Sequence, residues 1–120
     1  MTNHRPVGLE DRGLCYLITT EAPLRKHIFG IEKAMETATL LPKKDEILLD
    51  LSKIFIMRMS DIAILKDLEY TATNKYNLSL SLVNPKPNVR CFMKNMKVNE
   101  EIGLFDNMEH YRSLRENRYK

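Results

Sequence analysis

A row of apolar residues between Leu24 and Ala38 is the sequence feature that most constrains the fold. On an α-helix, residues spaced four and three apart lie along one side. Pro42 follows shortly afterwards and ends such a helix, because the residue before a proline disfavours helical backbone. Thr20 is a suitable N-cap. The sequence therefore predicts a helix from Thr20 to just before Pro42, and its apolar side carries Leu24, Ile28, Ile31, Met35 and Ala38.

This apolar side packs either on the core of the domain or against the same helix of a second copy. In the second case the chain forms a homodimer, and the dimerisation residues are Leu24, Ile28, Ile31 and Met35.

The length and composition predict a single domain over residues 1–120, with residues 1–8 as a loose lead. The 120 residues are 43% hydrophobic and 29% charged, which is enough apolar material for one continuous core. No apolar run approaches the roughly 18 to 20 residues that a membrane span requires, and the polar N-terminus lacks the hydrophobic stretch of a secretory signal. We therefore expect a cytoplasmic protein without membrane contact.

The middle of the chain predicts two more helices. One begins near Glu46 and buries Ile47, Leu48, Leu51, Ile54 and Phe55. Ser60 caps a short helix over Asp61–Asp67, and Leu68 is the buried residue of the turn that follows. The apolar run Leu14–Ile18 fits either a strand or a helix, and we favour the helix.

The last part of the chain contains strand and turn signals. Leu78, Leu80 and Leu82 alternate with serines as in a half-buried strand, although a helix remains possible. Asn84–Asn88 is a proline-rich turn, and Val89–Met93 has the composition of a strand. A final helix is predicted over residues 98–118. The fold class expected is mainly α with a small β-hairpin and flanking N- and C-terminal helices.

The segment 46–93 resembles the core of winged helix-turn-helix transcription regulators. The resemblance rests on an apolar helix, a short capped helix beginning Ser60-Asp61-Ile62-Ala63, the turn residue Leu68 and a polar segment after Tyr70. The flanking helices are similar in placement to those by which MarR-like and SarA-like regulators dimerise. Two features depart from the pattern: the usual glycine of the turn is missing, and the alternation of leucine and serine allows the recognition helix to end near Asn77. The recognition helix exists only if the segment after Tyr70 is helical.

The resemblance implies that the chain binds double-stranded DNA. The major groove admits a helix whose exposed side carries short polar groups that reach base edges and phosphates. The proline-rich turn acts as the wing along the DNA backbone. The predicted DNA-binding residues are Thr71, Thr73, Asn74, Lys75 and Asn77 on the helix, Lys86 and Arg90 on the wing, and Arg112 on the last helix.

Two alternatives remain open. The segment Thr71–Asn77 is also typical of a solvated polar turn between a helix and a hairpin. The chain is alternatively a non-enzymatic helical adaptor or chaperone-like protein that presents the Leu24–Ala38 stripe to a protein partner. An enzyme is not expected, because no nucleophile motif, phosphate-binding glycine loop or framed pair of carboxylates is present. The histidines and cysteines lack metal-ligand spacing, so we expect no metal and no cofactor.

Overall fold

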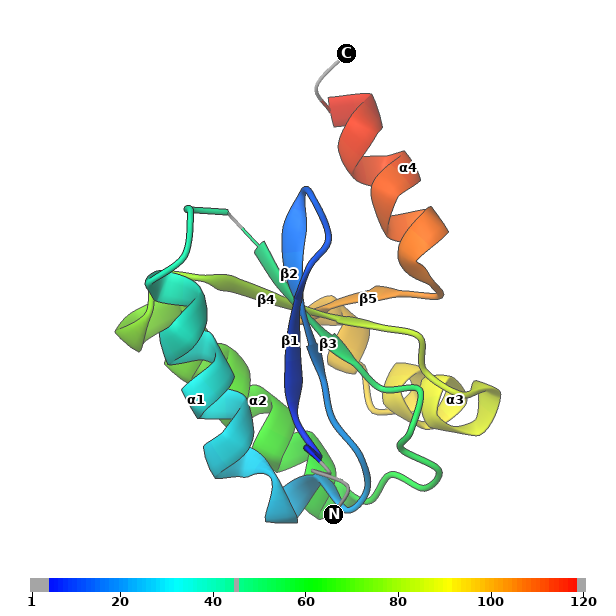
Figure 1. The fold of residues 1–120 in the computed structure, drawn as a ribbon. Helices are drawn as coiled ribbons and strands as arrows, with labels where there is room; N and C mark the ends of the chain where they lie inside the picture. Colours follow the sequence, from blue (N-terminus) through cyan, green and yellow to red (C-terminus); the bar gives the residue numbers. More distant parts are fainter. Residues whose placement is uncertain (1–4, 45, 119–120) are drawn as a thin grey trace.

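A five-stranded mixed sheet forms the centre of the molecule, and helices cover both of its faces (Figure 1). The computed structural model describes residues 5–44 and 46–118. The spatial order is β1-β2-β3-β4-β5; β1 pairs antiparallel with β2, and the other pairs are parallel. The strands are β1 (Gly8–Asp11), β2 (Cys15–Thr19), β3 (Glu46–Asp50), β4 (Ser79–Val83) and β5 (Gly103–Phe105). The helices are η1 (Leu24–Lys26), α1 (Ile28–Thr39), α2 (Met59–Lys75), α3 (Pro87–Asn95), η2 (Val98–Glu100) and α4 (Met108–Arg118).

The prediction of a mainly α fold with one small hairpin is wrong, chiefly because of the segment after Glu46. The predicted helix there is strand β3 followed by a loop. Ile47, Leu48 and Leu49 are all fully buried. A central strand that is covered on both faces shows no alternation of apolar and polar residues, so its apolar run is easily taken for a helix. The same ambiguity made Leu14–Ile18 a helix in the prediction, whereas the structure places strand β2 there.

The core consists of two layers separated by the sheet. The larger layer lies between the sheet and helices α1, α2 and α3, with Ile18, Leu49 and Leu82 from successive strands at its centre. The smaller layer lies on the other face, where Tyr111 of α4 packs over Leu17 and Leu48. Burial of both faces is the arrangement expected for parallel strands joined by helices.

Helix α2 is continuous, and this removes the predicted helix-turn-helix. Leu68 lies inside α2 rather than in a turn, and the helix runs on to Lys75. No glycine or proline interrupts the segment. Leu65, Leu68 and Ala72 follow one another at helical spacing and are all buried, so the core holds the whole helix in place.

The predicted wing is also absent. The leucine-and-serine segment forms strand β4 (Ser79–Val83), as one of the two alternatives had it, but β4 is an interior strand of the sheet. Val89–Met93, expected to be a strand, belongs to helix α3. Pro87 occupies the first turn of α3, where its missing N–H costs nothing, and Val89 and Met93 are buried at a spacing of four.

The two ends of the chain differ from the prediction in extent. Helix α1 is present as expected, although it begins at Ile28 and not at Thr20. The predicted helix over residues 98–118 is divided into η2, β5 and α4. Of the predicted lead, residues 1–4 lie outside the described residues, and Gly8 begins β1. Among the described helices, none combines the length and the apolar character needed to cross a membrane. The cytoplasmic location stays a prediction.

Candidate functional site

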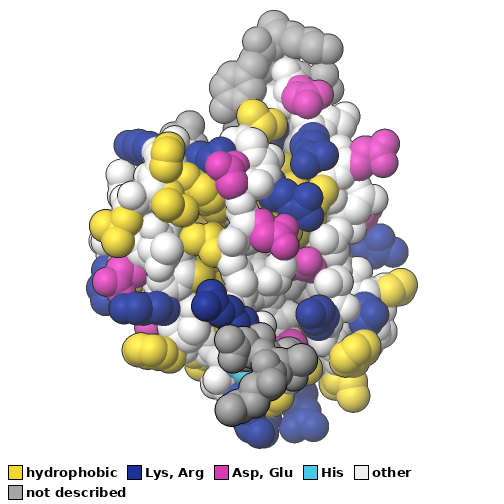
Figure 2. Space-filling view, viewed as in Figure 1, with side chains coloured by type: hydrophobic (Ala, Val, Ile, Leu, Met, Phe, Trp, Pro, Cys, Tyr) yellow, Lys and Arg dark blue, Asp and Glu magenta, His cyan; other side chains and the backbone are white. Residues whose placement is uncertain are grey.

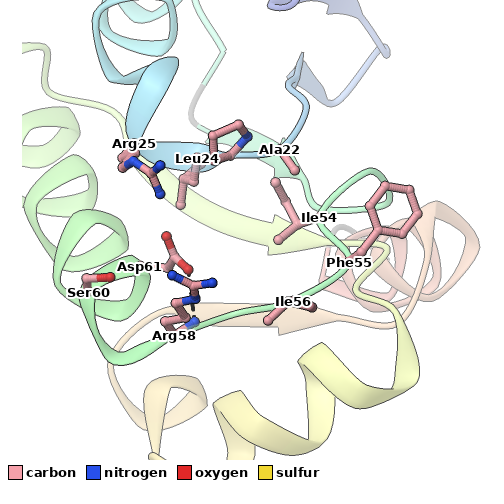
Figure 3. A pocket seen from close by; sticks show the side chains of 10 residues that line it. Ala22, Leu24, Arg25, Ile54, Phe55, Ile56, Arg58, Ser60 and Asp61 are labelled. Atoms are coloured by element: carbon pink, nitrogen blue, oxygen red, sulfur yellow. Dashed lines mark hydrogen bonds between the residues drawn. The ribbon is translucent and has the colours of Figure 1, made fainter.

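A pocket of about 200 Å³ lies where the parallel strands β2 and β3 end (Figure 3). Its walls come from the turn between β2 and η1, the loop between β3 and α2, and the first turn of α2. In open α/β sheets, ligands bind outside the carboxyl ends of the strands, because the loops that follow the strands meet there. The lining residues are Ala22, Pro23, Leu24, Arg25, Ile54, Phe55, Ile56, Arg58, Ser60 and Asp61.

The loop between β3 and α2 combines buried anchors with exposed apolar side chains. Leu51 and Ile54 are buried, and the N–H of Leu51 donates to the carbonyl of Val83 at 2.9 Å. By contrast, Phe55 is 60% exposed and Ile56 is 69% exposed. Met59, at the start of α2, is 58% exposed. We call these three residues, Phe55, Ile56 and Met59, the apolar rim. Neighbouring exposed apolar side chains on an anchored loop are typical of a surface that binds another molecule.

The start of helix α3 holds Phe55 of the apolar rim in position. The side-chain amide of Asn88 donates to the carbonyl oxygen of Phe55 at 2.7 Å. The ammonium group of Lys86 lies 4.9 Å from the centre of the Phe55 ring, within the range of a cation–π contact. Phe55 is therefore exposed but fixed, which lowers the entropy cost of using it as a contact.

The polar side of the pocket is formed by Arg25, Arg58, Ser60 and Asp61 (Figure 3). Asp61 accepts a hydrogen bond from the N–H of Arg58 at 2.9 Å and so closes the first turn of α2. Ser60 lies in that turn and is exposed. The lining contains no histidine or cysteine, and the part of the chain that the structure describes holds no cluster of residues suited to a metal ion. The pocket therefore presents two guanidinium groups, a hydroxyl and a carboxylate beside an apolar wall.

The structure does not bring the predicted DNA-binding residues together. Thr71, Thr73, Asn74 and Lys75 lie in the last turns of α2, and Asn77 follows the helix. Several of them bond locally: the amide of Asn74 donates to the carbonyl of Tyr70 at 2.9 Å, and Thr73 donates to Glu69 at 3.2 Å. A 17-residue helix is about 25 Å long, so this end is remote from the pocket.

The remaining predicted DNA contacts lie on other elements. Lys86 precedes α3 and contacts Phe55. Arg90, on α3, forms an ion pair with Asp106 at 3.0 Å. The hydrogen bond from Arg90 holds the pKa of the Asp106 carboxyl below its usual range. Arg112 is an exposed residue of α4, on the opposite side of the sheet.

The residues predicted to form a dimer are located in the interior of this chain. Leu24, Ile31 and Met35 are buried in the larger core layer, and Ile28 is partly buried against it. Of the two arrangements expected for this helix, the structure shows packing on the core of the domain.

Sequence reasoning missed the apolar rim. It assigned Phe55 to the buried side of a helix and gave Ile56 no role. One signal was available: Ile54–Met57 is an apolar run directly before the capped start of a helix, and it is too short and too irregular to form an element of its own. In this structure the run lies in the loop between β3 and α2, and Phe55 and Ile56 within it face solvent.

Comparisons with known proteins agree with this architecture. No protein-family model matches the sequence, and no curated protein matches it significantly. Solved structures do match. A chain from the molecular architecture of the stressosome, a signal integration and transduction hub, superposes with a TM-score of 0.71 at 13% identity, covering 94% of this chain and 99% of that one.

Two further matches are to anti-sigma factor antagonists. A putative anti-sigma factor antagonist from Thermotoga maritima gives a TM-score of 0.67 at 10% identity, covering 93% of this chain and 94% of that one. The anti-sigma factor antagonist SpoIIAA, in its unphosphorylated form, gives 0.61 at 15% identity, covering 91% and 96%. The chain has the fold of the STAS domain.

The observed structure corrects both the predicted fold class and the predicted function. The winged helix-turn-helix resemblance to MarR-like and SarA-like regulators is wrong, because the groove-reading helix and the wing do not exist. The prediction of a DNA-binding transcription regulator falls with it. The alternative, a protein that binds a protein partner, agrees better with these structural neighbours.

Proposed function

We propose that this chain is a non-catalytic regulator that binds a protein partner through the apolar rim, in the manner of an anti-sigma factor antagonist. The observation that carries the proposal is the exposure of Phe55, Ile56 and Met59 near the carboxyl edge of the parallel strands, where Asn88 holds Phe55 by a hydrogen bond. Anti-sigma factor antagonists are among the proteins with this fold. The Leu24–Ala38 stripe, first considered as the partner surface, is unsuitable because its side chains are largely inside the core.

The charges around the apolar rim indicate the chemistry of the partner. Arg25 and Arg58 line the adjoining pocket, and Lys86 covers one side of Phe55. Asp61 is the acidic residue among the lining side chains, and it is engaged at the N-terminus of α2. A matching partner surface therefore has an apolar depression with carboxylates around it, because opposite charges at the border of an interface favour the correct encounter.

Replacing both Phe55 and Ile56 by alanine should weaken partner binding by about 2 kcal/mol, or roughly 30-fold, because both residues are large apolar contacts at the centre of the rim. The measurement is isothermal titration calorimetry against each anti-sigma factor encoded in the same genome. Leu40→Ala is the matched control, since Leu40 is 82% exposed at the other end of α1. Wild-type affinity in the double variant, an equal loss in the control, or no binding to any of these proteins would contradict the proposal.

Ser60 is the residue of this surface best placed to regulate binding. The description of SpoIIAA as unphosphorylated implies a second, phosphorylated form of that protein. In this chain Ser60 is exposed in the first turn of α2, next to Met59 of the apolar rim, and it lines the same pocket as Arg25 and Arg58. A phosphate there carries about two negative charges and is favoured by the helix N-terminus.

Ser60→Glu should therefore lower partner affinity by about tenfold, because the carboxylate offsets the arginines and repels the acidic border of the partner. Ser60→Ala should bind like the wild type. The control is Ser113→Glu, which places the same charge on an exposed position of α4. Calorimetry with the same partner measures all three variants, and equal affinity of Ser60→Glu and the wild type would exclude Ser60 as a regulatory position.

A further inference from the structure

A second hollow lies on a different side of the molecule, between α1 and β1. Its volume is about 630 Å³. Residues 5–9 form one wall, and the other is formed by Lys26, His27 and one side of α1. Gly30 brings the two walls together, because a Cβ at this position would lie 2.9 Å from Val7 Cγ2. Phe29, which is 79% exposed, stands at the border of the groove.

The groove is basic. Arg5, Lys26, His27 and Lys33 line it, and no carboxylate is among the lining residues. Lys33 has an exposed partner, Glu36, at 3.6 Å, and such a surface pair is weak. Within residues 5–44 and 46–118, no ion pair involves Arg5 or Lys26. The space-filling view shows Lys and Arg side chains on both sides of the lower part of this face (Figure 2).

The acidic residues of β1 do not line the groove, and each has a cation of its own beside it. Glu10 pairs with Arg12 at 3.2 Å, and Asp11 pairs with Lys44 at 2.7 Å. The hydrogen bond from Lys44 lowers the pKa of the Asp11 carboxyl, so Asp11 stays ionised and bound to that lysine. The groove therefore keeps an excess of positive charge.

The floor of the groove is the open edge of the sheet. β1 is the first strand in the spatial order and lies in front of the other strands in Figure 1. Among the described residues no strand pairs with its outer side. Alternate N–H and C=O groups of an edge strand point away from the sheet and are available to another chain.

We propose that this groove binds an acidic, extended segment of a protein partner, which pairs with β1 as an added strand. Backbone hydrogen bonds to β1 supply binding that is independent of side chains, as in other cases of strand addition. Carboxylates on the added strand meet Lys26 and Lys33, and apolar side chains contact Phe29. The inference does not rest on the proposed function, since Phe55, Ile56 and Met59 are not part of this groove.

The test uses the full chain and a fluorescein-labelled peptide of alternating valine and glutamate, followed by fluorescence anisotropy at about 50 mM salt. The peptide should bind, and the double variant Lys26→Glu/Lys33→Glu should bind it at least about tenfold more weakly. Lys94→Glu, on the exposed side of α3, is the control and should have no effect. All three lysines are exposed, so these variants should fold as the wild type does, which circular dichroism verifies.

A second peptide separates strand addition from simple attraction of charges. Methylation of alternate backbone nitrogens keeps the charge of the peptide but removes the hydrogen bonds to β1, so binding should be lost. Hydrogen exchange should show slower exchange of the Gly8–Asp11 amides only with the unmethylated peptide. Equal binding of the two peptides, no binding by either, or self-association of the chain through this edge would overturn the inference. Phe55→Ala should leave peptide binding unchanged, so the two proposals fail independently.

Discussion

Replacing Leu49 by alanine should lower the free energy of unfolding by about 2–5 kcal/mol. Leu49 is fully buried on β3, between Ile18 of β2 and Leu82 of β4 in the sheet register, and it faces the larger core layer. Alanine removes the apolar contacts of the leucine side chain and leaves a cavity. Strand β3 is paired with a strand on each side, so it cannot move far enough to fill that cavity completely. Urea denaturation followed by circular dichroism measures the change.

The Leu49 variant also distinguishes the two interpretations of this segment. On the helix predicted from the sequence, Leu49 lies beside the stripe of Ile47, Leu48 and Leu51, so its loss would cost little. In the sheet, Leu49 is as buried as its two neighbours. Ile56→Ala is the control, because Ile56 is mostly exposed and should change stability by no more than about 0.5 kcal/mol. A similarly small effect for Leu49→Ala would argue against β3.

Replacing Glu46 by alanine should also destabilise the fold, by about 1–3 kcal/mol, because two polar groups of α4 then lose their partner. Arg115 binds the Glu46 carboxylate through two nitrogens, Nε at 2.8 Å and Nη2 at 2.5 Å. The hydroxyl of Tyr111 donates to the same carboxylate. The side chains of Glu46 and Arg115 are each only 14% exposed, so water replaces the lost contacts poorly.

The effect of Glu46→Ala should be visible as loosening of α4, which hydrogen exchange in α4 relative to α1 measures. The control is Glu36→Ala, since Glu36 forms an exposed pair with Lys33 and should contribute little. Protection of α4 that is unchanged in Glu46→Ala would show that apolar packing alone holds this helix.

The pH dependence of stability offers an independent check of the same contact. Burial, followed by the hydrogen bond to Glu46, raises the pKa of Tyr111, and burial raises the pKa of Cys15. The folded chain thus keeps these protons where the unfolded chain releases them, above about pH 8.5 for cysteine and about pH 10 for tyrosine. Their contribution is complete below those values and is lost as the pH rises. In Tyr111→Phe, the fall in stability above about pH 10 should be shallower.

Two segments explain why the elements were only partly predictable. The Leu24–Ala38 stripe was informative because apolar and polar residues alternate with a helical period, and α1 lies there. Val89–Met93 was misleading because its composition favours a strand. The segment nevertheless forms helix α3, because Val89 and Met93 pack against the core and Pro87 fits the first turn of the helix. Tertiary contacts outweigh a local preference of this size.

The candidate site was less predictable than the helices. The exposure of Phe55 depends on where β3 ends and on the hydrogen bond from Asn88, which is 33 residues away in the sequence. The basic groove similarly combines residues of η1 and α1 with the backbone of β1. In both cases the residues that meet in space are distant in the sequence. A search for motifs within one segment therefore could not find either surface.

The sequence by itself determined the amphipathic helix α1, because its period lies within one segment. It left the segment of β4 open between a strand and a helix. Only the tertiary structure decided that β2 and β3 are strands, that α2 continues through Leu68, and that Phe55 and Ile56 face solvent. The physical reason is that an interior parallel strand is apolar on both sides and has partners distant in sequence. Its identity becomes visible only when the sheet and the helices that cover it are assembled.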